Sequence, residues 1–197
     1  MAQVKGNCAL ANCPLQPAQT VQPLPPQTRL LLAEAYATQS QSDFKVYRDF
    51  LQDTEECHRL HFLQMACEKI AKAYRLRDTP NFPEENLYSH VFFSKFILSL
   101  LTSPEIKNRY RARDAKLKQM VRDGQRLSRQ IETLAPAVDR EQIPSNVEYP
   151  WIEGNAVFTP CLYGYANFSL LTTPGGREFL RLITIAIEDF QSIRISG

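Results

Sequence analysis

Polar side chains that could bind a ligand or exchange protons recur along residues 55–77. They follow a helical spacing of three or four residues and comprise His58, His61, Gln64, Glu68, Lys72 and Arg75. Imidazole, amide, carboxylate and ammonium groups on one face can donate and accept hydrogen bonds, and histidine titrates near neutral pH. We therefore expect His61, Gln64, Glu68 and Lys72 to line a cleft for a small ligand or a nucleotide. A plain polar helix face, or a dimer contact, is the alternative interpretation.

A second candidate site lies in a basic segment further along the chain. Between Glu105 and Glu132, nine lysines and arginines accompany four acids, so the segment carries +5 while the whole chain carries +2. The cations at its start are suited to contacts with the phosphates of RNA or DNA: Lys107, Arg109, Arg111, Arg113, Lys116 and Lys118. Tyr110 could stack on a base. The alternatives are an acidic protein partner, or a solvated helix supported by pairs such as Asp114 with Lys118.

Common catalytic and metal-binding signatures are missing. The sequence contains no glycine-rich phosphate loop ending in Lys-Ser/Thr, no Cys-x2-Cys and no Gly-x-Ser-x-Gly. Cys8 and Cys13 are the only close cysteine pair, and a metal site there would need two more ligands, such as His58 and His61. We expect no metal site and no cofactor, and we expect the buried cysteines to be reduced thiols.

The segment 55–77 must itself be a helix for its polar groups to meet. It has no proline or glycine, and its apolar residues recur on one face: Leu60, Leu63, Cys67, Ile70 and Tyr74. Alanines beside this stripe would let neighbouring helices approach closely. The pattern predicts a central helix with one side in the core and the other in a cleft or an interface.

The residues from His61 to Tyr74, HFLQMACEKIAKAY, resemble the second-helix signature of the HEPN superfamily: His or Tyr, then Gln-Ala, then Glu-Lys-x-x-Lys-Ala. The residues from Ser89-His90 onward resemble the histidine-led third helix of that family. This resemblance implies an antiparallel helical bundle and a module that binds a partner protein or nucleic acid in a toxin–antitoxin-like or defence setting. It also implies a nucleotidyltransferase-type protein partner.

HEPN ribonucleases share an Arg-x4–6-His motif, in which histidine acts as acid and base and arginine stabilises the developing charge. None of the three histidines here has an arginine at the required distance before it, and no histidine follows His90. We therefore expect a non-catalytic binding or regulatory module. The alternative is a divergent, metal-independent ribonuclease in which folding brings together His61 or His90 with the arginines Arg109, Arg111 and Arg113.

Other helices are predicted from periodicity and from capping signals. The expected spans are 28–52, 85–102 (the most buried helix), 104–135 after the capping residue Ser103, and a last helix after the capping residue Thr173. Residues 136–176 contain prolines, glycines and aromatics without a helical period, which predicts a packed loop. Three stretches there could form short strands: 147–151, 157–158 and 163–171.

Taken together, these patterns predict an all-α fold: an antiparallel HEPN-like bundle of four to five helices with a C-terminal aromatic and proline-rich loop. We expect a flexible arm rich in proline and glutamine at residues 1–27 and a single helical domain over 28–197. The chain has no basic stretch followed by a long apolar run near its start and no long apolar segment elsewhere, so we expect a cytoplasmic protein without membrane contact. Surplus apolar and polar helix faces predict a homodimer.

Overall fold

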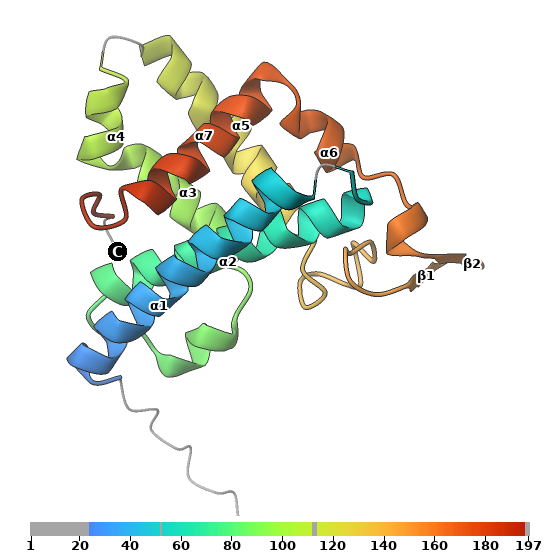
Figure 1. Cartoon of the computed structure of the whole chain (residues 1–197), viewed down its shortest axis with the longest axis horizontal. Helices are drawn as coiled ribbons and strands as arrows, with labels where there is room; N and C mark the ends of the chain where they lie inside the picture. Colours follow the sequence, from blue (N-terminus) through green and yellow to red (C-terminus); the bar gives the residue numbers. More distant parts are fainter. Residues whose placement is uncertain (1–23, 52, 112–113, 196–197) are drawn as a thin grey trace, which may run out of the picture.

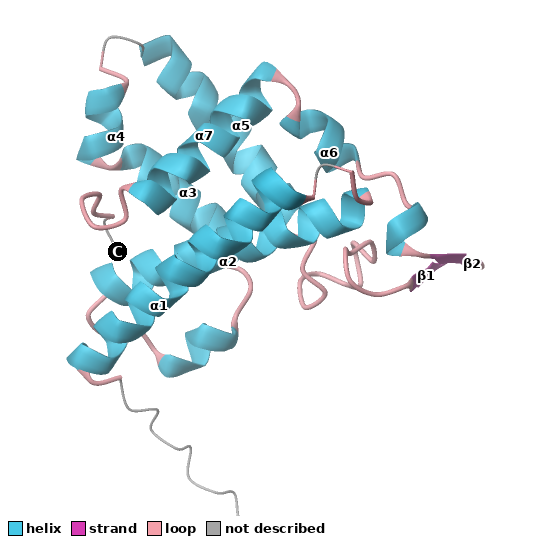
Figure 2. Cartoon of the chain, viewed as in Figure 1, coloured by secondary structure: helices cyan, strands magenta, loops and turns pink. Residues whose placement is uncertain are grey.

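The computed structural model describes residues 24–51, 53–111 and 114–195, which form a mostly helical molecule with one small β-hairpin (Figures 1 and 2). The predicted all-α class is confirmed. The α-helices are α1 (Pro26–Lys45), α2 (Glu56–Asp78), α3 (Phe93–Thr102), α4 (Pro104–Arg109), α5 (Asp114–Glu132), α6 (Ala166–Leu171) and α7 (Pro174–Glu188). The shorter elements are a π-helical turn η1 (Val46–Phe50), the 3-10 turns η2 (Glu84–Tyr88) and η3 (Pro160–Leu162), and the strands β1 (Trp151–Glu153) and β2 (Ala156–Phe158).

The first helix begins slightly earlier than its periodicity predicts. Pro26 occupies its first turn, where the missing backbone N–H has no intrahelical partner to lose. The helix runs to Lys45 and continues through η1 to Phe50. Most of the predicted arm at residues 1–27, including Cys8 and Cys13, lies outside the described residues.

Helices α1 and α2 form an antiparallel hairpin, as predicted. The start of α1 meets the end of α2, where the Arg29 guanidinium donates to the carbonyl of Leu76. In the middle of the pair, the Ser40 hydroxyl donates to the carbonyl of Ala66 at 2.7 Å. These bonds satisfy buried polar atoms at two places along the contact between the helices.

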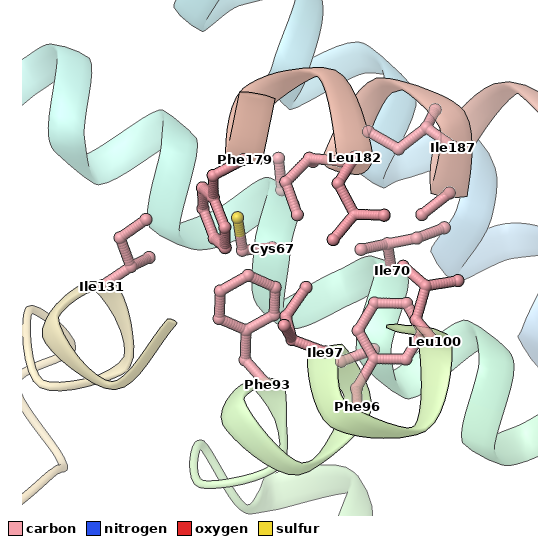
Figure 3. Packing of buried hydrophobic residues seen from close by; sticks show 14 of the residues in the cluster. Cys67, Ile70, Phe93, Phe96, Ile97, Leu100, Ile131, Phe179, Leu182 and Ile187 are labelled. Carbon is pink, nitrogen blue, oxygen red and sulfur yellow. The ribbon is translucent and has the colours of Figure 1, made fainter. Parts of the chain in front are cut away.

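The predicted role of α2 as the central helix is confirmed. Its apolar stripe is fully buried, and Figure 3 shows Cys67 and Ile70 of α2 facing side chains of α3 and α7. Phe93 of α3 and Phe179 of α7 meet edge to face across this core, with ring centroids 6.1 Å apart. Truncating such a residue to alanine typically costs about 2–5 kcal/mol, so this contact region dominates the stability of the fold.

The predicted third helix, 85–102, is wrong in its first half. The chain forms η2, passes through an extended segment, and only then enters α3. Val91 and Leu98, which one continuous helix over 85–102 would place on the same face as the buried Leu101, are exposed, whereas Phe93, Phe96 and Ile97 are buried. The most buried helix is α2 rather than α3. The extended segment carries His90, whose ring bonds to Glu68 of α2.

The predicted fourth helix, 104–135, is two helices. Ser103 caps α4 as expected, since its hydroxyl accepts a hydrogen bond from the Ile106 N–H at 3.4 Å. The chain then leaves the helix at Tyr110, whose side chain is buried and donates to Glu178 of α7 at 2.5 Å. Helix α5 packs on α3, and Gly124 permits this approach, because a Cβ there would lie 3.3 Å from Leu101 Cδ1.

The segment 136–176 is partly regular. Strands β1 and β2 pair antiparallel, with Ile152 opposite Val157. The predicted stretch 157–158 lies in β2, whereas the predicted stretch 147–151 overlaps β1 only at Trp151. Gly154 lies in the two-residue turn with a φ of 60°, a conformation that glycine adopts without strain. The third stretch, 163–171, is wrong as a strand, because α6 forms there and packs on α5 and α7.

The last helix agrees with its prediction. Thr173 caps α7 by accepting a hydrogen bond from the Gly176 N–H at 3.1 Å. Phe179, Ile183 and Ala186, which recur on one face of α7, are buried. Phe190 and Ile193 continue this spacing in the sequence and are also buried, but they lie beyond the end of α7 at Glu188. Helix α7 therefore closes the core over α2, α3 and α5.

Candidate functional site

Three of the four predicted cleft residues meet on α2. The Glu68 carboxylate accepts hydrogen bonds from Gln64 at 2.9 Å and from Lys72 at 2.7 Å, both one turn away on the same helix. His90 reaches the same carboxylate, with Nδ1 2.8 Å from Oε2 of Glu68. The Lys72 ammonium also lies 5.9 Å from the ring centre of Tyr36 on α1. The four polar side chains thus form one network centred on Glu68.

The charges in this network stabilise one another. Burial by itself raises the pKa of Glu68, but the hydrogen bonds from Lys72 and His90 outweigh it, so the pKa lies below its ordinary value. The pKa of Tyr36 is raised, first by burial and then by the negative charge of Glu68. At neutral pH Glu68 is therefore an anion and Tyr36 a neutral phenol.

His61 does not join this network. Its Nδ1 lies 3.5 Å from a carboxylate oxygen of Glu148, in the loop before β1. Gln64 and Lys72 are buried within the chain. The structure thus brings together Gln64, Glu68 and Lys72 but leaves His61 elsewhere, and a ligand cleft along this face stays a prediction.

The six predicted phosphate-binding residues are divided by the break between α4 and α5. Lys107, Arg111 and Lys118 are exposed. Arg109 forms an ion pair with Asp189 after α7, and Lys116 pairs with Glu178 at 2.9 Å. Arg113 lies outside the described residues. The expectation that Tyr110 stacks on a base is wrong, because its ring is buried and its hydroxyl is bonded to Glu178.

A better-formed basic surface lies along α5. Four exposed cations recur there at a spacing of four, four and three residues: Lys118, Arg122, Arg126 and Arg129. We call them the α5 basic stripe. Within the described residues, no ion pair involves any of the four. This spacing is visible in the sequence. Arg122, Arg126 and Arg129 contribute to the net charge of the segment between Glu105 and Glu132, but they are not among the six predicted phosphate-binding residues.

A pocket of about 360 Å³ lies between α5 and α7, and we call it the α5–α7 pocket. Its walls are mainly apolar, and its rim carries two pairs of polar side chains. The residues that line it are Lys116, Gln119, Met120, Asp123, Gly124, Pro174, Gly175, Glu178, Phe179 and Leu182. Sequence reasoning missed this pocket, because its two walls are about 55 residues apart along the chain.

One end of the pocket is organised around Glu178, which accepts hydrogen bonds from Tyr110 and Lys116. Burial raises the pKa of Glu178, but these two donors outweigh it and hold the pKa below its ordinary value. Burial and the bond to Glu178 raise the pKa of Tyr110 to about 12. At neutral pH this end presents an anion that already has two donors, beside the ammonium of Lys116.

At the other end, the Asp123 carboxylate lies beside the start of α7. A Cβ on Gly175 would be 2.8 Å from Oδ2 of Asp123, so the Asp123 side chain would have to shift if residue 175 had a side chain. The Gln119 amide donates to both Asp123 oxygens at 2.9 Å. A helix dipole stabilises an acidic group near the helix N-terminus. At the N-terminus of α7 the protein itself provides this acidic group, Asp123.

Among the described residues, no group of three or more His, Cys, Asp or Glu side chains is placed to hold a metal ion. Cys57 and Cys67 are buried free thiols, as predicted, and Cys161 is an exposed one. No helix in the described part of the chain is both long enough and apolar enough to cross a membrane.

Comparison with known proteins finds no match to this chain among protein-family models, curated proteins or solved structures. The resemblance to HEPN proteins therefore stays a prediction, and function has to be argued from the geometry above.

Proposed function

We propose that this chain is a non-catalytic binding module that holds nucleic acid on the exposed face of α5. The observation that carries the proposal is the α5 basic stripe. With a helical rise of about 1.5 Å per residue, its cations follow one another at intervals of about 4.5–6 Å along the helix axis. A row of this kind can contact successive phosphates of one strand.

The composition of the stripe favours phosphate over a merely solvated helix. A solvated helix usually mixes both signs on its exposed face, whereas none of the α5 side chains described as exposed is acidic. Three of its four members are arginines, whose planar guanidinium donates two parallel hydrogen bonds to a phosphate. The side chains of Lys118, Arg126 and Arg129 have no hydrogen bond or ion pair with other described residues that would compete with such a ligand.

The alternative ribonuclease gains less support. The Glu68 carboxylate orients the His90 ring, as a partner of an acid–base histidine would. Yet Arg109 is engaged by Asp189 beyond α7, and Figure 1 shows α4 at the opposite edge of the molecule from η2, the turn that precedes His90. His61 is held by Glu148 instead. An active site would need a histidine beside an arginine, so the binding module is the better-supported proposal.

The mostly helical fold is consistent with the HEPN resemblance, and a HEPN-like bundle of four to five helices stays a prediction. A toxin–antitoxin-like or defence setting, a nucleotidyltransferase-type partner, a homodimer and a cytoplasmic location stay predictions. None of them is needed for the binding proposal.

Fluorescence anisotropy with labelled RNA and DNA at increasing salt tests the proposal. We expect binding at low salt that weakens steeply as salt rises, because contacts to phosphates release counterions. Lys118→Glu combined with Arg129→Glu should weaken binding and reduce the slope of log affinity against log salt by about 0.7 for each lost contact to a single strand.

The matched control is Lys45→Glu combined with Lys95→Glu, which makes the same charge change at exposed positions of α1 and α3. This control should bind nearly as well as the wild type. If both double variants lose affinity equally, net charge rather than the α5 basic stripe explains binding. If an acidic polypeptide such as polyglutamate displaces the nucleic acid at equal charge concentration, an acidic protein is the better candidate partner.

A further inference from the structure

The α5–α7 pocket adjoins the α5 basic stripe, and the two features complement each other. Asp123 and Gly175 also line a smaller hollow of about 120 Å³, whose wall includes Arg126 of the stripe. The pocket and the stripe are thus connected over a short stretch of surface. A ligand that lies along the stripe can therefore place a side group in the pocket.

The walls of the pocket suit a flat, largely apolar group. Met120, Phe179 and Leu182 supply apolar atoms, and the Phe179 ring is held in place edge to face by Phe93. A volume of about 360 Å³ is at the small end of ligand pockets, which commonly hold about 300–1,000 Å³. It suits a ring system better than the apolar face of a partner helix.

The rim of the pocket offers both donors and acceptors. Gln119 with Asp123, and Lys116 with Glu178, form two pairs on either side of the opening. A nucleobase carries donors and acceptors along its edge and an apolar face above and below, so it can satisfy both kinds of surface at once.

We infer that the α5–α7 pocket receives one unpaired base of a single-stranded nucleic acid whose phosphates lie on the α5 basic stripe. This inference rests on the proposed function and adds a preference for single strands. A base in a duplex is stacked and paired, and it would have to be unpaired at a cost of a few kcal/mol before it entered the pocket. Phosphate contacts by themselves would not distinguish the two forms in this way.

The test compares three labelled ligands of equal length: a single-stranded RNA, the same RNA annealed to its complement, and a backbone in which the bases are missing. Wild-type protein should bind the single strand about tenfold more tightly than the abasic backbone, the effect expected of one stacked base. Gln119→Trp should abolish this preference, because an indole at the rim would occupy the opening. The salt dependence of the variant should stay close to that of the wild type, since all four cations of the stripe remain, although Arg122 loses the Gln119 oxygen to which it donates.

Gln142→Trp is the matched control, because Gln142 is exposed in the loop before β1 and the variant should keep the preference. A direct readout is photo-crosslinking with RNA that contains 4-thiouridine, which should label peptides carrying Met120 or Phe179. Equal affinity of the wild type for all three ligands would overturn the base pocket while leaving the basic surface intact. Failure of every ligand to bind at low salt would instead overturn the proposed function.

Discussion

Nδ1 of His90 lies 2.8 Å from Oε2 of Glu68, and this contact fastens the extended segment before α3 to the middle of α2. The same carboxylate holds Lys72 through its other oxygen at 2.7 Å. Glu68 is therefore the shared partner of two cationic or donor groups from separate parts of the chain. The residues around His90 are extended although their sequence has a helical period, and this contact ties them to α2.

Replacing Glu68 by glutamine should lower the free energy of unfolding by about 1–3 kcal/mol, the typical cost of leaving a buried polar partner unsatisfied. Urea unfolding monitored by circular dichroism would measure it. Glu85→Gln, an exposed change within η2, is the control and should have little effect. Equal stability of the two variants would mean that the network contributes little to the fold.

The stability contributed by Glu68 should depend on pH in one direction. The pKa of Glu68 is lowered in the folded protein, so the unfolded state binds protons more readily. Its contribution is present above the ordinary glutamate pKa of 4.5 and is lost as the pH falls through the lower folded value. As the pH is lowered from 6, the free energy of unfolding should therefore decrease less steeply for Glu68→Gln than for the wild type. An identical acid profile in both proteins would contradict this.

Gly176→Ala should destabilise the protein by about 3 kcal/mol or prevent folding, since overpacking against rigid neighbours has costs of this size. A Cβ at Gly176 would lie 2.2 Å from the carbonyl oxygen of Leu170 and 2.5 Å from the Leu171 Cα, both backbone atoms that cannot move aside. Gly164→Ala is the matched control, because a Cβ there meets nothing within 4 Å. Thermal melts of the two variants would separate them, and similar melting temperatures would count against this packing.

Tyr110→Phe should lower the free energy of unfolding by about 1 kcal/mol, the usual net value of one hydrogen bond. The change removes the hydroxyl that joins the break between α4 and α5 to Glu178 of α7. Tyr149→Phe removes a hydroxyl from an exposed ring and should be neutral. If Tyr110→Phe also left the free energy of unfolding unchanged, burial of the ring by itself would be enough to keep the chain in place between α4 and α5.

Purified protein should not cleave RNA in a metal-free assay. His61 lies beside Glu148, His90 beside Glu68 and Arg109 beside Asp189, so neither histidine is paired with Arg109. Cleavage needs a titratable group close to the attacked phosphate. The assay should include His61→Ala, His90→Ala and Arg109→Glu/Arg111→Glu beside the wild type. Activity that follows the protein through purification and disappears in one of these variants would overturn the non-catalytic proposal.

A homodimer, if it forms, should use the β-hairpin rather than the polar face of α2. Ile152 and Val157 face each other across the hairpin and are both exposed, and Figure 1 shows the hairpin projecting from the helical body. Two strands also leave backbone groups unpaired at their edges. Light scattering at about 100 µM, above micromolar dissociation constants, should give a dimer for the wild type and a monomer for Ile152→Lys/Val157→Lys. A wild-type monomer would contradict the dimer, and a dimeric variant would move the interface elsewhere.

Local sequence patterns by themselves determined the central helix and the starts of α4 and α7. The stripe from Leu60 to Tyr74 is buried as its spacing predicts, and Ser103 and Thr173 cap their helices. These features depend on neighbours within a few residues, since periodicity orients a face and a cap satisfies the N–H groups of the first turn. They needed no knowledge of the rest of the chain.

Tertiary structure decided where a segment with a helical period is not a helix. It also decided where the candidate site lies. The helix expected through Tyr110 ends there, where the Tyr110 ring is buried and its hydroxyl bonds to Glu178, 68 residues away. The segment at His90 is extended and bonds to Glu68. The α5–α7 pocket exists only because α5 and α7 pack side by side. Such partners are close in space but distant along the chain, so no local spacing reveals them, and their burial outweighs the small differences in helix propensity that guided the sequence prediction.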